Sequence, residues 1–216
     1  MIYSIFRIFG LITGYPVQLL FFKRRTFYES KKNKNTFKGG KLIISNHFNF
    51  LDYVLSCFIV FPRKLTAVTC EMPFRSRIVR FGMKFFGSVE ADRETKNMRF
   101  MDQSANIIKK DQLVIIYPEG QNTPDGKMHK FYHSYLVIAH RAKCPIVPMI
   151  TDGRYHPFKR ANVIIGDEID VSVFFSQDRN TPTREELSKA NEYVYSKMLE
   201  LQRQLESKKA ERRRRK

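Results

Sequence analysis

From Lys41 onward, short apolar runs bounded by turn residues alternate with longer segments whose apolar residues recur at helical spacing. The apolar runs predict strands at 41–45, 65–70, 87–91, 112–118, 144–151 and 162–169. The segments between them predict helices at 50–60, 74–86, 95–110 and 131–143. Strands that alternate with helices are typical of an α/β fold, so we expect a largely parallel central sheet covered by helices.

The C-terminal region predicts a helix with one apolar side. Thr183 is a typical N-cap residue, and Glu185 and Glu186 follow in the first turn. An apolar stripe then recurs at helical spacing: Leu187, Ala190, Val194, Met198, Leu201 and Leu205. We expect an amphipathic helix over 181–207 that packs on the domain, with contact to a partner or a membrane as the alternative.

The N-terminal stretch "MIYSIFRIFGLITGYPVQLLFFKRR" is apolar and ends in a basic cluster. Arg7, Gly10, Gly14 and Pro16 interrupt it within the roughly 20 residues that a membrane-spanning helix needs. No small-residue cleavage site follows a short apolar core, so we do not expect a signal peptide. The pattern favours a helix that lies in the membrane interface; the alternative is a helix that covers the domain's own core.

The length of 216 residues predicts a single domain with short additions at both ends. We expect a membrane-associating helical segment over 1–38, an α/β domain over 39–180, the C-terminal helix over 181–207 and a basic tail over 208–216. The three cysteines lie far apart and in no paired or metal-ligand spacing, which indicates reduced thiols in a reducing compartment.

The formal net charge of +18 is concentrated at the ends of the chain. Residues 1–38 carry a net charge of +7 and residues 207–216 carry +6. A nucleic-acid enzyme would spread its basic residues along a groove of the folded body, so we expect no nucleic-acid partner. Basic ends favour an anionic lipid surface, and we expect a membrane-associated protein on the cytoplasmic face. The alternative is a solvated basic tail.

Three polar segments follow predicted strands and carry the candidate chemistry. They are "SNHFNFLD" (45–52), "GSVEADR" (87–93) and "YPEGQNT" (117–123). The carboxyl ends of parallel strands meet at one edge of a sheet, so these segments could converge on one cleft. Histidine titrates near neutral pH and suits the role of general base. We interpret His47 as that base and Asp52 as the carboxylate that orients it.

These segments also carry a family resemblance. "NHFNFLD" resembles the His-x4-Asp signature of the glycerolipid acyltransferases, a family typified by 1-acylglycerol-3-phosphate (lysophosphatidic acid) acyltransferase. "GSVEADR" and "YPEGQNT" are similar to the second and third blocks of that family, and "CPIVPMI" (144–150) is similar to the fourth. The order and spacing of the blocks agree over about residues 41–170, which is most of the chain.

The resemblance implies transfer of a fatty acyl group from acyl-CoA or acyl-ACP to the hydroxyl of a lysophospholipid such as 1-acylglycerol-3-phosphate. His47 would remove the proton of the hydroxyl and Asp52 would orient the imidazole, with no acyl-enzyme. Arg93 would hold the phosphate of the acceptor. The resemblance assigns the rest of the substrate site to the third block: Glu119, Gly120, Gln121 and Asn122. It implies no cofactor and no metal.

The third block departs from the family pattern, which usually runs Glu-Gly-Thr-Arg-Ser. Gln121, Asn122 and Thr123 stand in the last three places, so the arginine that the family pattern implies for phosphate is missing. Other basic residues could substitute for it: Lys127, Lys130 and Arg154. Two alternatives therefore stay open. One is a different lysolipid acceptor, such as a lyso-aminolipid, and the other is a lipid-binding member of the fold without catalysis.

Overall fold

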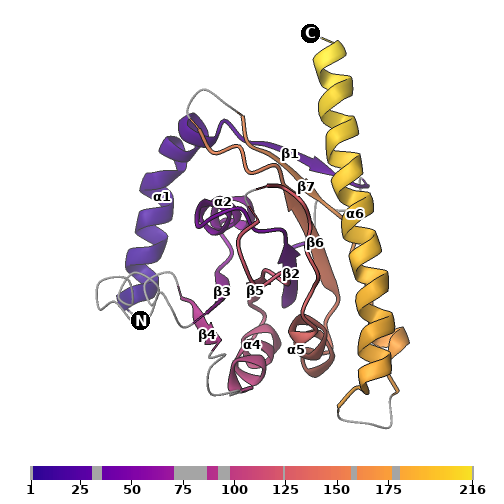
Figure 1. Ribbon diagram of the computed structural model, residues 1–216. Helices are drawn as coiled ribbons and strands as arrows, with labels where there is room; N and C mark the ends of the chain where they lie inside the picture. Colours follow the sequence, from indigo (N-terminus) through magenta and orange to yellow (C-terminus); the bar gives the residue numbers. More distant parts are fainter. Residues whose placement is uncertain are drawn as a thin grey trace.

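The computed structural model describes residues 2–30, 36–70, 87–91, 98–123, 125–156, 160–176 and 181–215. Its described strands form one seven-stranded sheet in the order β1-β7-β6-β2-β5-β3-β4 (Figure 1). The strands are β1 (Arg25–Tyr28), β2 (Lys41–Ser45), β3 (Leu65–Cys70), β4 (Val89–Ala91), β5 (Leu113–Ile116), β6 (Ile146–Thr151) and β7 (Asn162–Ile165). All neighbouring pairs are parallel except β6 and β7, which are antiparallel.

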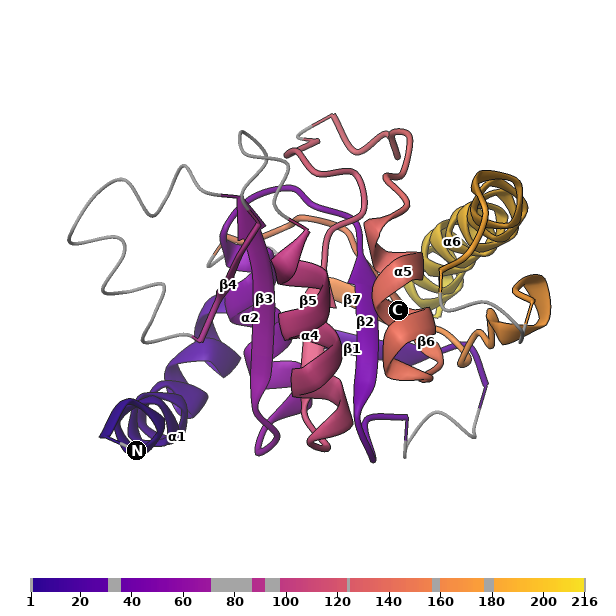
Figure 2. The ribbon, with the colours of Figure 1, turned by 90° about the horizontal axis from the view of Figure 1, so that it is seen from below.

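Helices cover both faces of this sheet. They are α1 (Ile2–Phe22), α2 (Leu51–Val60), α4 (Arg99–Lys109), α5 (Ser134–Ala142) and α6 (Arg184–Arg214), with a short 3-10 helix η3 (Ser172–Phe174). Figure 2 shows α4 and α5 in front of the strands, with α1 and α6 at opposite margins of the view. Side chains of α1 and α2 fill the core on one face, and those of α4, α5 and α6 fill the core on the other.

The alternation of side chains along β2 shows how the two cores are built. Leu42 and Ile44 belong to the core under α4, α5 and α6, whereas Ile43 belongs to the core under α1 and α2. All three side chains are fully buried. A parallel strand that is covered on both faces needs apolar residues at consecutive positions, which explains the continuous apolar runs of the sequence. The predicted α/β fold with a largely parallel sheet is confirmed.

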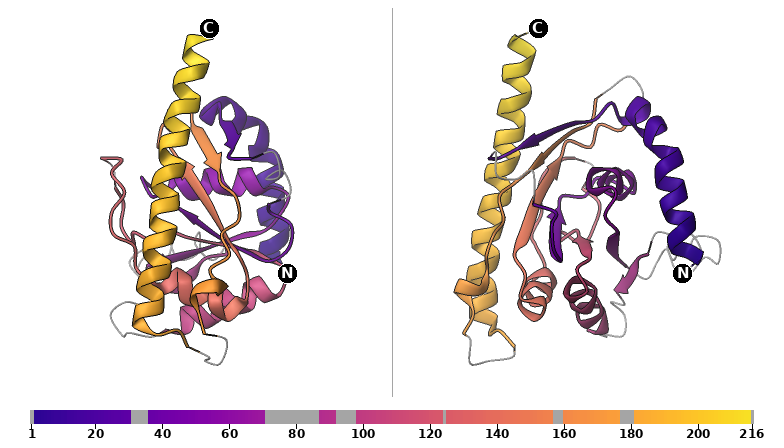
Figure 3. Two further views of the ribbon diagram at one scale, coloured as in Figure 1. Left: turned by 90° about the vertical axis from the view of Figure 1, so that its right-hand side faces the viewer. Right: turned by 180° about the vertical axis from the view of Figure 1, so that it is seen from behind.

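The ends of the chain differ from the prediction in two ways. Residues 25–28 form the edge strand β1, which pairs with β7, although the prediction placed 1–38 in a helical segment. Helix α6 continues to Arg214, through most of the predicted tail at 208–216. Figure 3 shows its C-terminal end projecting beyond the rest of the chain. The predicted Thr183 cap is present, because its hydroxyl accepts the backbone N–H of Glu186. The predicted helix at 74–86 lies outside the described residues.

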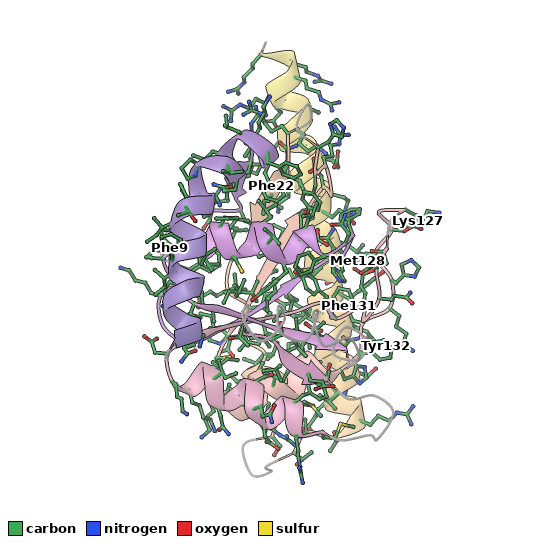
Figure 4. The ribbon with its side chains drawn as sticks, turned by 90° about the vertical axis from the view of Figure 1, so that its left-hand side faces the viewer. Phe9, Phe22, Lys127, Met128, Phe131 and Tyr132 are labelled. Carbon is green, nitrogen blue, oxygen red and sulfur yellow. The ribbon has the colours of Figure 1, made fainter. Side chains whose placement is uncertain are left out.

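Helix α1 runs continuously through Gly14 and Pro16 and has a packed side and an exposed side. Leu11 and Phe22 are buried, and the Tyr15 ring packs on α2. Large apolar side chains are exposed along the rest of the helix: Ile8, Phe9, Ile12, Val17, Leu19 and Leu20. In Figure 4, Phe9 lies on the outer side of α1, whereas Phe22 lies against the body. None of the described helices is long and apolar enough to cross a membrane.

Candidate active site

The turn between β2 and α2 is built around one carboxylate. Asp52 Oδ2 lies 2.9 Å from His47 Nδ1 and accepts the backbone N–H groups of Phe48 at 2.6 Å and Asn49 at 2.8 Å. The Asp52 side chain is fully buried. Burying a carboxylate is costly unless hydrogen bonds replace its water, and these donors supply them. The local sequence therefore folds so that His47 is held against Asp52.

The second oxygen of the same carboxylate is bonded from a distant part of the chain. Asp52 Oδ1 accepts the hydroxyl of Tyr155, which lies in the loop after β6. Tyr155 in turn lies 2.5 Å from Thr151 Oγ1, and that oxygen accepts the backbone N–H of Gly153 at 3.0 Å. Burial, followed by the charge of Asp52, raises the pKa of Tyr155 well above its ordinary value, so its hydroxyl keeps the proton that it donates.

The side-chain amide of Asn46 links the end of β6 to the end of β2. Asn46 donates its side-chain N–H to the carbonyl of Thr151 at 2.9 Å, and its side-chain oxygen accepts the backbone N–H of Thr151 at 2.9 Å. Asn46 is buried, and it extends the pairing of β2 and β6 by one step beyond their ladder. The residue directly before His47 thus fixes the position of the turn relative to β6.

The imidazole of His47 lies flat against the ring of Tyr117, which follows β5. The ring centroids are 4.0 Å apart and the planes differ by 16°. Because Nδ1 faces Asp52, Nε2 is the nitrogen left for a substrate. The His47 side chain is 20% exposed, so a ligand can reach it. A partly exposed histidine whose Nδ1 faces a buried carboxylate has the arrangement of a general base.

The third polar block meets the first through backbone contacts. The backbone N–H and the hydroxyl of Thr123 both donate to the carbonyl of His47, at 2.7 Å and 3.0 Å. Gly120 turns the chain at φ +68°, and its N–H donates to the carbonyl of Tyr117 at 3.0 Å. Gln121 and Asn122 are exposed between these two fixed points. The structure therefore brings the blocks at 45–52 and 117–123 together.

Glu119 is buried beside this junction. One oxygen accepts the backbone N–H of His129 at 2.8 Å. The other is buried, and no hydrogen bond of good geometry reaches it. Burial raises the pKa of Glu119, and the His129 bond offsets part of that shift. Glu119 thus ties the loop at 125–132 to the end of β5, and Figure 4 shows Lys127 and Tyr132 on that loop.

Arg93 lies outside the described residues, so the structure says nothing of its position. Among the basic residues named as substitutes, Arg154 lines a surface hollow of about 270 Å³ together with Phe48 and Asp152. The Arg154 Nε lies 3.8 Å from Asp152 Oδ2. In the part of the chain that the structure describes, no group of His, Cys, Asp or Glu side chains has the arrangement of a metal site.

The loop after β6 is also attached to the end of α6. Asp152 accepts the backbone and side-chain N–H groups of Asn162, at 2.9 Å and 2.7 Å. Its Oδ2 lies 3.2 Å from the Nζ of Lys209, which also contacts Glu206 at 2.7 Å. The side chains of Lys209 and Asp152 are only 7% and 4% exposed. An ion pair so well buried fixes the loop that carries Tyr155.

Comparison with known proteins gives this site its family. Residues 24–152 match the family model described as Acyltransferase. A 1-acyl-sn-glycerol-3-phosphate acyltransferase of Cocos nucifera is 28% identical over 88 residues, which are 41% of this chain and 28% of the Cocos protein. The chain therefore matches less than a third of the length of that relative.

A solved structure shows that the fold is shared. The crystal structure of the 1-acyl-sn-glycerophosphate (LPA) acyltransferase PlsC from Thermotoga maritima aligns with a TM-score of 0.62 at 20% sequence identity. The alignment covers 94% of this chain and 80% of the PlsC chain. The family model spans more than half of the chain and includes the turn at 45–52 and the block at 117–123. The chain belongs to the Acyltransferase family.

Proposed function

We propose that the chain is an O-acyltransferase that moves a fatty acyl group from acyl-CoA or acyl-ACP to the hydroxyl of a lysophospholipid such as 1-acylglycerol-3-phosphate. The observation that carries this proposal is the His47–Asp52 pair, with Asp52 buried and the His47 side chain partly exposed. Family membership and the names of the two relatives support the acyl transfer and the lysophospholipid acceptor.

The proposed reaction uses His47 twice. Nε2 of His47 takes the hydroxyl proton while the hydroxyl oxygen attacks the thioester carbonyl carbon. The carbon–sulfur bond of the resulting tetrahedral intermediate then breaks, and the imidazolium returns the proton to the leaving sulfur. The products are an ester and a free thiol. The Asp52 carboxylate stabilises the imidazolium through Nδ1. The acyl group passes directly to the acceptor, so no acyl-enzyme forms.

The acceptor is the part of the proposal that the third block affects most. Gln121 and Asn122 carry no charge, so a phosphate on the acceptor would be held by other basic residues. The candidates for that role are Arg93 and the three possible substitutes, Lys127, Lys130 and Arg154. The second candidate function is acylation of a phosphate-free lysolipid such as a lyso-aminolipid. Asn122 favours it, because an uncharged amide stands where the family pattern has an arginine.

We also propose that the chain works at an anionic membrane surface on the cytoplasmic face. The exposed apolar side of α1 provides an area that can enter the lipid interface. The basic residues at both ends would add attraction to anionic headgroups. An amphipathic acceptor could then reach His47 from the lipid without passing through water.

The experiment that tests the activity is release of free thiol from acyl-CoA, with and without lysophosphatidic acid, by the parent and by His47→Ala. We expect release that depends on the acceptor, and a loss of roughly 10²–10⁴-fold in the variant, as for a missing general base. His140→Ala is the control, because His140 lies on α5 against Phe175, outside the site.

Each outcome of this assay decides one part of the proposal. Activity of His47→Ala within a few-fold of the parent would rule out His47 as the base. Release with a phosphate-free lysolipid but not with lysophosphatidic acid would select the second candidate acceptor. No release with either acceptor, from acyl-CoA or from acyl-ACP, would favour a lipid-binding protein without catalysis.

A further inference from the structure

The two carboxylate oxygens of Asp52 accept hydrogen bonds from different parts of the chain. Oδ2 accepts from His47 and from the backbone of the turn, all within five residues in the sequence. Oδ1 accepts from Tyr155, which is 103 residues away. A carboxylate can rotate about its last bond, and a donor on Oδ1 fixes that rotation. The carboxylate is therefore held at both oxygens, at Oδ2 by the turn and at Oδ1 by Tyr155.

The hydrogen bonds that link Tyr155 and Thr151 to Asp52 can run in only one donor-to-acceptor direction. Tyr155 has one hydroxyl proton, which goes to Asp52, so its oxygen must accept the proton of Thr151. Thr151 in turn accepts the backbone N–H of Gly153. Donors in such a row polarise one another and strengthen the last bond. The row begins at the backbone after β6 and ends at the carboxylate.

We propose that Tyr155 is a positioning residue of the site, holding Oδ1 of Asp52 so that Oδ2 orients the imidazole of His47. This inference rests on the proposed function of His47 as general base. Tyr155 does not touch the substrate in this proposal and acts only through Asp52. The Tyr155 hydroxyl also stabilises negative charge on Oδ1. This weakens the electrostatic attraction between Asp52 and a protonated His47.

Two other titratable groups in the described residues lie near His47 and Asp52, and their charge state bears on the expected pH profile. Tyr117, after β5, stacks on the imidazole, and burial raises its pKa well above the ordinary value, so it stays neutral. Glu119 lies near the backbone of His47, and burial raises its pKa as well. Neither group contacts Oδ1 of Asp52. The hydrogen-bonded route from Tyr155 to His47 therefore runs through Asp52.

The test is Tyr155→Phe, read as the pH profile of kcat/KM in the thiol-release assay. The phenyl ring keeps the edge contact with Phe22, whose ring centroid lies 5.6 Å away, so the fold should survive. We expect a loss of about tenfold to a hundredfold, the range for one hydrogen bond to a charged group. We also expect the acid limb of the profile to move to higher pH, because Asp52 then stabilises the imidazolium more strongly.

Tyr135→Phe is the matched control. Its hydroxyl is also buried and bonded, to Asn191 at 2.9 Å, but it lies in the core on the other face of the sheet. It should leave both the rate and the profile unchanged. Thr151→Val is a second variant that keeps Tyr155 and removes the donor behind it. It should move the acid limb in the same direction by a smaller amount.

The outcomes separate this inference from the proposed function. If His47→Ala is inactive and Tyr155→Phe has the rate and profile of the parent, Tyr155 is not a positioning residue, although His47 remains the base. An equal loss at every pH, with the acid limb in place, would also overturn the inference, since it indicates a structural role. If His47→Ala is active, the proposed function itself fails.

Discussion

Asp52 can hold the active-site turn because its carboxylate has more lone pairs than a histidine needs. His47 and the backbone N–H groups of Phe48 and Asn49 all converge on Oδ2, and Oδ1 is left for Tyr155. A turn whose backbone donors end on the orienting carboxylate cannot shift without losing the contact to His47. The His-x4-Asp spacing is therefore a structural requirement of the turn as well as a chemical one.

Glu119 gives a prediction about pH. Because burial raises its pKa in the folded chain, the folded state binds a proton more readily than the unfolded state does. The stability from this group is therefore largest below the ordinary glutamate pKa and falls as the pH rises through the raised value. Glu119→Gln removes the titration. We expect the melting temperature of the parent, relative to the variant, to fall as the pH rises above the ordinary glutamate pKa of about 4.3. A constant difference would contradict the raised pKa.

Single residues of the site differed in how far the sequence could predict them. His47 and Asp52 lie five positions apart, so a local pattern was enough to place them together. Thr123 and Tyr155 reach the same turn from 76 and 103 residues away. No local signal marks such a contact, because only the order of the strands decides it. Arg93 lies outside the described residues, and its role stays a prediction.

Among the strands of the sheet, β1 was not predicted from the sequence pattern. Its four residues, Arg25 to Tyr28, come directly after the basic residues Lys23 and Arg24 that follow α1, and all four are only partly buried. They form a strand because their backbone pairs with the edge of β7, and Phe27 and Tyr28 then pack against the two cores. The strands with continuous apolar runs were predictable because they are buried on both faces.

The C-terminal helix carries a prediction at Lys209. Lys209→Met keeps the aliphatic stem and removes the nearer cation from the buried Asp152, which then faces the more distant Arg154, whose Nε lies 3.8 Å away. We expect unfolding to become easier by about 3 kcal/mol, as for a broken buried ion pair, and acyl transfer to weaken because the same loop carries Tyr155. Lys189→Met is the control, since its pair with Glu185 is exposed on the same helix. Equal melting temperatures for the two variants would contradict a structural role for Lys209.

At the scale of the whole molecule, the membrane proposal depends on charge and apolar surface acting together. We expect the parent to float with vesicles that contain anionic lipid, and to be released as salt rises. Replacing Phe9, Ile12 and Leu20 by glutamine should abolish flotation without unfolding the chain, because these side chains are exposed. Val173→Gln, an equally exposed position on η3, is the control. Flotation of the triple variant like the parent would contradict a role for α1.

The pairing of Asn46 with Thr151 joins positions 105 residues apart, and the Tyr155 bond to Asp52 spans nearly as far. A ribosome has therefore released His47 and Asp52 long before it has made the residues that hold them. During that interval the His-x4-Asp motif has been synthesised, but the contacts to β6 and Tyr155 that hold it cannot form. Contacts between residues so far apart in the sequence also form slowly. Under the proposed function, acyl transfer would report completed folding. A fragment that ends before β6 would contain the His-x4-Asp signature and would have no activity.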